Sequence, residues 1–149
     1  MRNLPALFAV GALMLGASGL ALGADLPKVT VYKSPTCGCC IKWADQLKAS
    51  GFPVETINVR DMVPIKQRYR VPPQLGSCHT AVVDGYVVEG HVPIEDVLRL
   101  LRERPDTQGI AVPGMPIGSP GMEGPNPQAF KVYAFDASGA IEEYAAHSP

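Results

Sequence analysis

Residues 29–40 read VTVYKSPTCGCC, a strand pattern followed by a loop that carries three cysteines. Residues 29–33 alternate in polarity and are rich in β-branched side chains, which predicts a strand. Residues 34–38 are turn-forming types, and the apolar spacing of residues 39–50 predicts a helix that stops at Gly51. The cysteines are therefore expected in the loop and first turn between a first strand and a first helix.

Five further elements are predicted before Pro105. They are a strand over Val54–Val59, a short helix over Met62–Arg68 capped by Asp61, a hairpin of Thr80–Val83 and Tyr86–Glu89 around Asp84-Gly85, and a helix that begins at Pro93. The order β-α-β-α-β-β-α, with a cysteine-bearing loop after the first strand, resembles that of thioredoxin-like domains. The sequence therefore predicts an α/β fold with a thioredoxin-like domain over residues 25–105.

The composition changes after residue 105. Residues 109–128 contain five prolines and several glycines without periodicity, so they predict a loop or extended arm without helix or strand. Lys131–Phe135 and Ile141–Ala145 then predict a hairpin. Residues 106–149 are thus expected to form a Pro/Gly-rich C-terminal extension that ends in a β-hairpin.

Residues 1–24 have the features of a signal peptide. Arg2 supplies a positive charge, Leu4–Leu22 carries no charge, and small residues follow at positions 21, 23 and 24. A retained transmembrane anchor is the alternative, which Pro5 and the many Ala and Gly residues weaken. Cleavage would release a periplasmic chain of about 125 residues with no stable membrane insertion.

The length and charge of the chain limit its function. The 149 residues, 46% of them hydrophobic, suffice for one compact domain, and we expect a monomer. Removal of Arg2 leaves 12 basic residues of the 13 in the whole chain, against 14 acidic ones. This balance does not attract nucleic acid, so no nucleic-acid partner is expected.

The cysteine loop has an arrangement suited to thiol or metal chemistry. Cys37 is predicted at a helix N-terminus, where the partial positive charge favours the thiolate, and Cys40 follows one turn later. Cys37 and Cys40 form a C-x-x-C pair that a disulfide or a metal can close. Cys39 is adjacent to Cys40 and needs a different partner.

Cys78 and His79 precede the third predicted strand, which in a thioredoxin-like layout lies against the cysteine loop. Thioredoxins commonly have a proline at this point. One interpretation is a structural framework of two disulfides, Cys37–Cys40 and Cys39–Cys78, in an exported domain. The other is a soft, ligand-rich pocket suited to Cu(I), Zn or an iron–sulfur centre.

Three further residues are candidates for the same pocket. His91 ends the fourth predicted strand and is either a ligand or an ordinary turn histidine. Met115 and Met122 lie in a segment rich in proline and glycine. They are either thioether ligands or hydrophobic side chains that cover the site. Thioether, thiolate and imidazole together favour copper over harder ions. We expect the C-terminal extension to pack on this metal site.

The chain resembles the exported copper-resistance proteins of the CopG family. The resemblance rests on Ser34-Pro-Thr-Cys37-Gly-Cys39-Cys40, Ser77-Cys78-His79-Thr80, Gly90-His91-Val92-Pro93 and Pro113-Gly-Met115-Pro-Ile-Gly-Ser-Pro-Gly-Met122, and spans residues 29–124. It implies a thioredoxin-like fold with a C-terminal extension, one or several copper ions near the cysteine motif, and interconversion of Cu(I) and Cu(II) in copper detoxification. The metal ligands carried over are Cys37, Cys39, Cys40, Cys78, His79, His91, Met115 and Met122.

Three functions remain open from the sequence. The first is a copper-binding redox protein in which Cys37 and Cys40 are the catalytic pair, with a copper efflux system or a periplasmic electron donor as partner. The second is a carrier that delivers copper without changing its oxidation state. The third is a thiol-disulfide oxidoreductase or an arsenate-reductase-like enzyme, which needs Cys37 and Cys40 alone.

Overall fold

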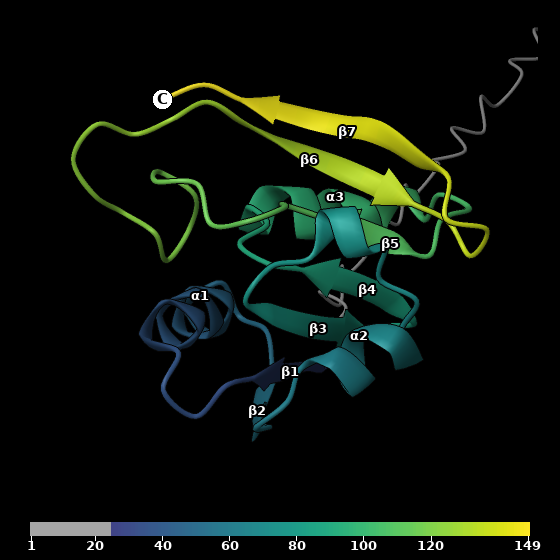
Figure 1. Cartoon of the computed structure of the whole chain (residues 1–149), viewed down its shortest axis with the longest axis horizontal. Coiled ribbons are helices and arrows are strands. Elements are labelled where there is room, and N and C mark those ends of the chain that lie inside the picture. The colour runs from purple at the N-terminus through teal and green to yellow at the C-terminus, as the bar shows by residue number, and fades with distance from the viewer. Residues whose placement is uncertain (1–24) are drawn as a thin grey trace, which may run out of the picture.

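A computed structural model describes residues 25–149 of the chain (Figure 1), so the predicted signal peptide lies outside the described residues. Within this range the chain forms seven strands, three α-helices and one 3-10 helix. In chain order they are β1 (Val29–Lys33), α1 (Gly38–Ala49), β2 (Val54–Asn58), α2 (Val63–Arg68), the 3-10 helix Pro73–Leu75, β3 (His79–Val83), β4 (Tyr86–Glu89), α3 (Ile94–Glu103), β5 (Gly109–Ala111), β6 (Phe130–Phe135) and β7 (Ile141–His147).

All seven strands belong to one mixed sheet with the order β2-β1-β3-β4-β5-β6-β7. The pairs β1–β2 and β4–β5 are parallel, and the other neighbours are antiparallel. In the β1–β3 pair, Lys33 lies opposite His79. This register brings the end of β1, from which the cysteine loop departs, beside the start of β3, where Cys78 and His79 lie.

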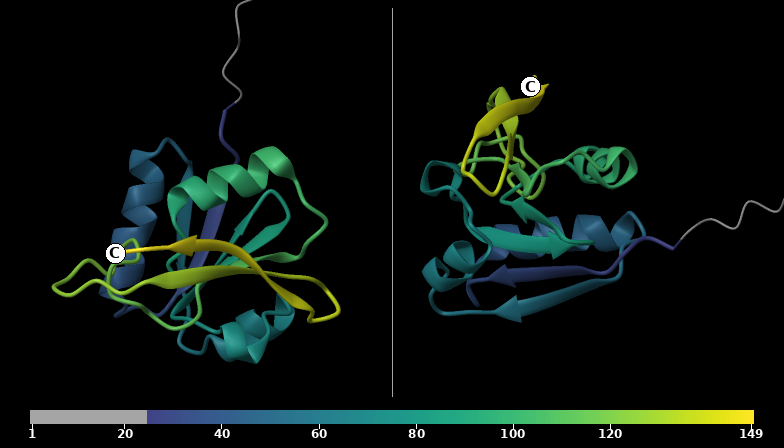
Figure 2. Two further views of the ribbon diagram at one scale, coloured as in Figure 1. Left: turned by 90° about the horizontal axis from the view of Figure 1, so that it is seen from above. Right: turned by 90° about the vertical axis from the view of Figure 1, so that its right-hand side faces the viewer.

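Helices cover both faces of the sheet. Helices α1 and α3 lie on one face and α2 on the other (Figures 1 and 2). Trp43 and Leu47 of α1 and Leu100 of α3 pack with strand residues in the larger core cluster. Because side chains alternate along a strand, Val88 of β4 joins this core while Val87 joins the smaller cluster behind it.

Most predicted elements are confirmed within one or two residues. The strand at 29–33, the hairpin around Asp84-Gly85 and the final hairpin all form. The Asp61 carboxylate accepts a hydrogen bond from the Val63 N–H at 2.9 Å, so it supports the start of α2. The last helix begins at Ile94, one residue after the predicted Pro93.

The prediction that residues 109–128 contain no strand is wrong at β5. Gly109–Ala111 pairs with β4 on one side and β6 on the other, and all three residues are buried. A strand of three residues is too short to show alternation in the sequence. A Cβ atom at Gly109 would overlap the Val87 carbonyl, so the glycine permits the close approach of β5 to β4.

Strands β5–β7 continue the sheet, and β7 also contacts α3. Val132 and Ala134 of β6 lie in the same core cluster as the residues of β1 and β3. His147 Nε2 lies 2.6 Å from the Asp96 carboxylate of α3. No helix within residues 25–149 is long and apolar enough to cross a membrane.

Candidate metal centre

The first turn of α1 holds three of the four cysteines. Cys37 is the N-cap residue, with an extended backbone, and the helix begins at Gly38, one residue before the predicted start at Cys39. Cys40 is fully buried one turn later. A disulfide joins Cys37 and Cys40, whose Cα atoms are 5.4 Å apart, and Cys39 remains a free thiol.

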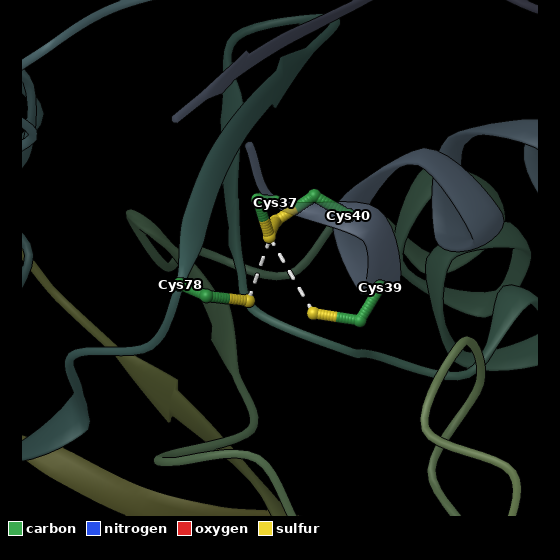
Figure 3. Close-up of side chains that lie close together, drawn as sticks. All are labelled: Cys37, Cys39, Cys40 and Cys78. Carbon is green, nitrogen blue, oxygen red and sulfur yellow. Dashed lines mark hydrogen bonds between the residues drawn. A yellow bond between two sulfur atoms is a disulfide. The ribbon is translucent and has the colours of Figure 1, made fainter. Parts of the chain in front are cut away.

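Cys78 brings the fourth sulfur to the same place from the start of β3 (Figure 3). Its Sγ lies 3.5 Å from Cys40 Sγ, and Cys39 Sγ lies 3.4 Å from Cys37 Sγ. All four sulfur atoms lie within 4.8 Å of one another. Since Cys39 and Cys78 are both free, the two-disulfide framework considered from the sequence does not form.

Two buried histidines extend the cluster from Cys78. Cys78 Sγ is 2.9 Å from His91 Nε2 and 3.5 Å from His79 Nδ1, and the three ligand atoms lie within 4.8 Å of one another. Both imidazoles are fully buried, and the His79 ring packs 4.5 Å from the Trp43 ring. His79 Nε2 has no hydrogen-bond partner among residues 25–149. A buried imidazole nitrogen without a partner can bind a metal ion or a hydrogen-bonding ligand.

Burial shifts the pKa values of Cys78, His79 and His91. Burial, and then the neighbouring Cys39, raise the pKa of Cys78 to about 12. Burial lowers the pKa of His79 well below its usual range, and the charges of His91 and Lys66 act in the same direction. Burial also lowers the pKa of His91, against the hydrogen bond to a backbone carbonyl. Neutral imidazoles are the form that binds metal, and a metal at Cys78 would displace a proton.

A buried carboxylate supports the Cys78–His79 segment from behind, and the sequence analysis missed it. Glu89 is fully buried at the end of β4 and accepts hydrogen bonds from the Ser77 N–H at 2.7 Å and the Thr80 hydroxyl at 2.6 Å. Lys66 of α2 pairs with the same carboxylate. Glu89 thus fixes the residues on both sides of Cys78 and His79.

The segment after β5 closes over the other side of the cluster. His91 Nδ1 lies 2.8 Å from the Pro120 carbonyl oxygen, which favours the Nδ1–H tautomer and leaves Nε2 free to face Cys78. Gly121 has a φ of +83°, and a Cβ atom there would lie 2.7 Å from the Cys39 carbonyl oxygen. Neither contact has a signal in the sequence beyond the Pro/Gly composition, because both involve backbone atoms.

The predicted ligands divide into three groups. The four cysteines, His79 and His91 lie together. Met122 lines a surface hollow with Cys39. Met115 is 51% exposed and is not among the residues that line this hollow.

Fold and site together define a mixed α/β protein with a partly buried, sulfur-rich cluster that can hold a soft metal. The chain belongs to the CopG family of copper resistance proteins, as its similarity to two solved structures shows. The first, "Copper resistance protein copG- Form 2", is 45% identical with a TM-score of 0.78, covering 83% of this chain and 99% of that one. The second, "Copper resistance protein copG- Form 1", is 44% identical with a TM-score of 0.78, covering 84% and 100%.

A protein family described as "Protein of unknown function, DUF411" also matches residues 75–122. This segment contains Cys78, both buried histidines and the two methionines of the loop. No curated protein sequence matches the chain significantly.

Proposed function

We propose that the protein binds copper in the periplasm and interconverts Cu(I) and Cu(II) at its cysteine cluster, as part of copper resistance. The observation that carries the proposal is the convergence of four cysteine sulfurs and two buried imidazoles from distant segments of the chain. Membership of the CopG family supports copper as the ion.

The donor set fits both oxidation states of copper. Thiolates stabilise Cu(I), and imidazoles also accommodate Cu(II). His79 Nδ1 at 3.5 Å and His91 Nε2 at 2.9 Å from Cys78 Sγ place nitrogen donors directly beside the sulfurs. In the reduced protein, six donors exceed the four that one tetrahedral ion needs, so the cluster then has capacity for more than one ion.

The Cys37–Cys40 pair supplies the electrons in this proposal. When the two thiols are oxidised, one S–S bond forms and two protons leave, while two Cu(II) ions each accept one electron and become Cu(I). The Cys37–Cys40 disulfide corresponds to the form of the pair that this step would produce. Renewed turnover needs a thiol or other two-electron reductant in the periplasm, and a copper efflux system would remove the ion.

The proposed architecture and location follow the same family resemblance. The segment from β1 to α3, with strands in the order β2-β1-β3-β4, is the part that we assign to a thioredoxin-like domain over residues 25–105. Residues 106–149 would be an extension that packs on the metal site, and residues 1–24 a cleaved signal peptide. We further propose that the mature protein is a monomer.

A thiol-disulfide oxidoreductase is the second candidate function. The Cys37–Cys40 disulfide at the N-terminus of α1 favours it. Such an enzyme does not use Cys78 or the histidines, so substitutions at these residues distinguish the two functions.

The test is anaerobic mixing of fully reduced, metal-free protein with two equivalents of Cu(II). We expect loss of the Cu(II) electron paramagnetic resonance signal, retention of copper by the protein, and disappearance of two thiols. Retention of Cu(I) supplied directly, without any reaction with Cu(II), would indicate a carrier.

Two variants sharpen the test. The double variant Cys78→Ser, His79→Ala keeps the C-x-x-C pair and is expected to lose copper binding. His147→Gln is the matched histidine control, because His147 lies at Asp96 and outside the cluster. Full copper stoichiometry and affinity in a folded double variant would contradict the proposal, whereas disulfide exchange without copper retention would support the oxidoreductase.

A further inference from the structure

The cysteine cluster is partly open to solvent, because Cys37, Cys39 and Cys78 are only partly buried. A surface hollow of about 400 Å³ lies against the first turn of α1 and the loop after β5. Of the eight predicted ligands, only Cys39 and Met122 line it. The fully buried Cys40, His79 and His91 do not reach this surface.

Cys39 connects the hollow to the interior. It lies outside the Cys37–Cys40 disulfide, and its Sγ contacts Cys37 Sγ at 3.4 Å (Figure 3). A soft ion that reaches Cys39 from the hollow therefore meets the other sulfurs without crossing an apolar layer.

Met122 is held beside Cys39 by the backbone of its loop. The Met122 N–H donates to the Ser119 carbonyl at 2.8 Å, and the Gly118 N–H donates to the Met122 carbonyl at 3.0 Å. Gly121, the preceding residue, packs directly against the Cys39 carbonyl. These contacts fix the Met122 backbone at the edge of the hollow.

Polar contacts anchor the same loop to α1. The Glu123 carboxylate accepts hydrogen bonds from the Gly121 N–H and from the Gln46 side chain, both at 2.7 Å. Lys42 also lines the hollow. The charges at the rim are therefore balanced, and the soft sulfur atoms are the groups that distinguish the hollow from ordinary surface.

From this arrangement we infer that the Cys39 hollow is the route by which Cu(I) enters and leaves the cluster, with Met122 as a transient thioether ligand at its mouth. A thioether binds Cu(I) selectively and releases it more readily than a thiolate, which suits a transfer position. This inference rests on the proposed copper-binding function.

The experiment measures the rate at which reduced protein takes Cu(I) from its bicinchoninate complex, by stopped-flow absorbance under anaerobic conditions. Met122→Leu is expected to slow uptake at least fivefold while leaving copper stoichiometry and affinity unchanged. Met62→Leu is the methionine control, because Met62 lies at the start of α2 and does not line the hollow, and it is expected to behave as the wild type.

A second variant tests the route without removing sulfur. Ile117 lines the hollow and is 37% exposed, so Ile117→Trp adds bulk there. It is expected to slow both Cu(I) uptake and alkylation of Cys39 by iodoacetamide, read by peptide mass spectrometry.

The outcomes separate the inference from the proposed function. Wild-type rates in both Met122→Leu and Ile117→Trp would overturn the route, and lower copper stoichiometry in Met122→Leu would make Met122 a resident ligand instead. If the wild type itself retains no copper, the proposed function fails and the route fails with it.

Discussion

Replacing Glu89 should destabilise the protein more than any exposed acidic substitution. Its carboxylate is fully buried and accepts hydrogen bonds from Ser77 and Thr80, and Lys66 completes an ion pair. Glu89→Ala leaves the Ser77 N–H and the Thr80 hydroxyl without their acceptor, at about 1–3 kcal/mol each. The Lys66 side chain is 20% exposed, so its ammonium group can be solvated by water in this variant. We therefore expect the free energy of unfolding to fall by about 3–5 kcal/mol in total.

Glu89→Gln removes the negative charge of the side chain but keeps its size and shape. The amide oxygen can still accept from Ser77, so we expect a smaller loss of about 1–2 kcal/mol. Glu55→Gln is the matched control, because Glu55 is a strand glutamate paired with Lys28 at 2.6 Å, yet both side chains are at least half exposed. Such surface pairs contribute about 0–1 kcal/mol.

The assay is urea unfolding of the metal-free, oxidised protein, followed by the fluorescence of Trp43, the one tryptophan of the chain. Trp43 is fully buried and packs on His79, so its emission reports on the core beside the site. A Glu89→Ala variant that loses less than about 1 kcal/mol, or no more than Glu55→Gln, would refute the role assigned to this carboxylate.

Three further predictions concern the site. Burial lowers the pKa of His79, so the unfolded chain binds more protons than the folded one below about pH 6.5. The metal-free protein is therefore most stable above that pH, and its free energy of unfolding falls, by an amount on the order of 1 kcal/mol, as the pH drops to about 5.5. His79→Leu should reduce this pH dependence in urea unfolding, with His91 contributing the remainder, and should weaken copper binding; an unchanged slope would show that His79 is not a source of it. Gly121→Ala should lower the free energy of unfolding by about 1–3 kcal/mol and weaken copper binding, because the added Cβ would meet the Cys39 carbonyl oxygen. Gly114→Ala is the control, since Gly114 also has a positive φ but a Cβ there would have nothing within 4 Å, and it should lower the free energy of unfolding less. Equal losses in the two variants would contradict this account. Mass spectrometry after alkylation should count two reactive thiols in the oxidised protein and four after reduction, and four without reduction would exclude the Cys37–Cys40 disulfide.

Elements with strong local patterns could be predicted from the sequence. The alternation of residues 29–33 and the Asp84-Gly85 turn both specify local structure, and both form. The position of Cys37 at a helix N-terminus also followed from its loop. The approach of Cys78 to the first turn of α1 could be expected only through the assumed topology, because 38 residues separate it from Cys40.

The features that the sequence did not reveal depend on tertiary contacts. Glu89 is the last residue of an otherwise apolar strand and resembles an exposed strand end, since nothing local indicates that Lys66 and Ser77 will surround it. The Pro120 carbonyl that orients His91 is a backbone group, which composition cannot identify. Strand β5 is too short for its alternation to be recognised.

The central claim is that sulfur and nitrogen donors from both distant segments bind copper together. Copper K-edge X-ray absorption on protein purified from copper-fed cells without chelators tests it most directly. The account predicts copper coordinated mainly by sulfur with additional imidazole nitrogen, and a smaller nitrogen contribution in His79→Ala, in which His91 remains. Protein without copper, or copper surrounded only by nitrogen and oxygen, would contradict it.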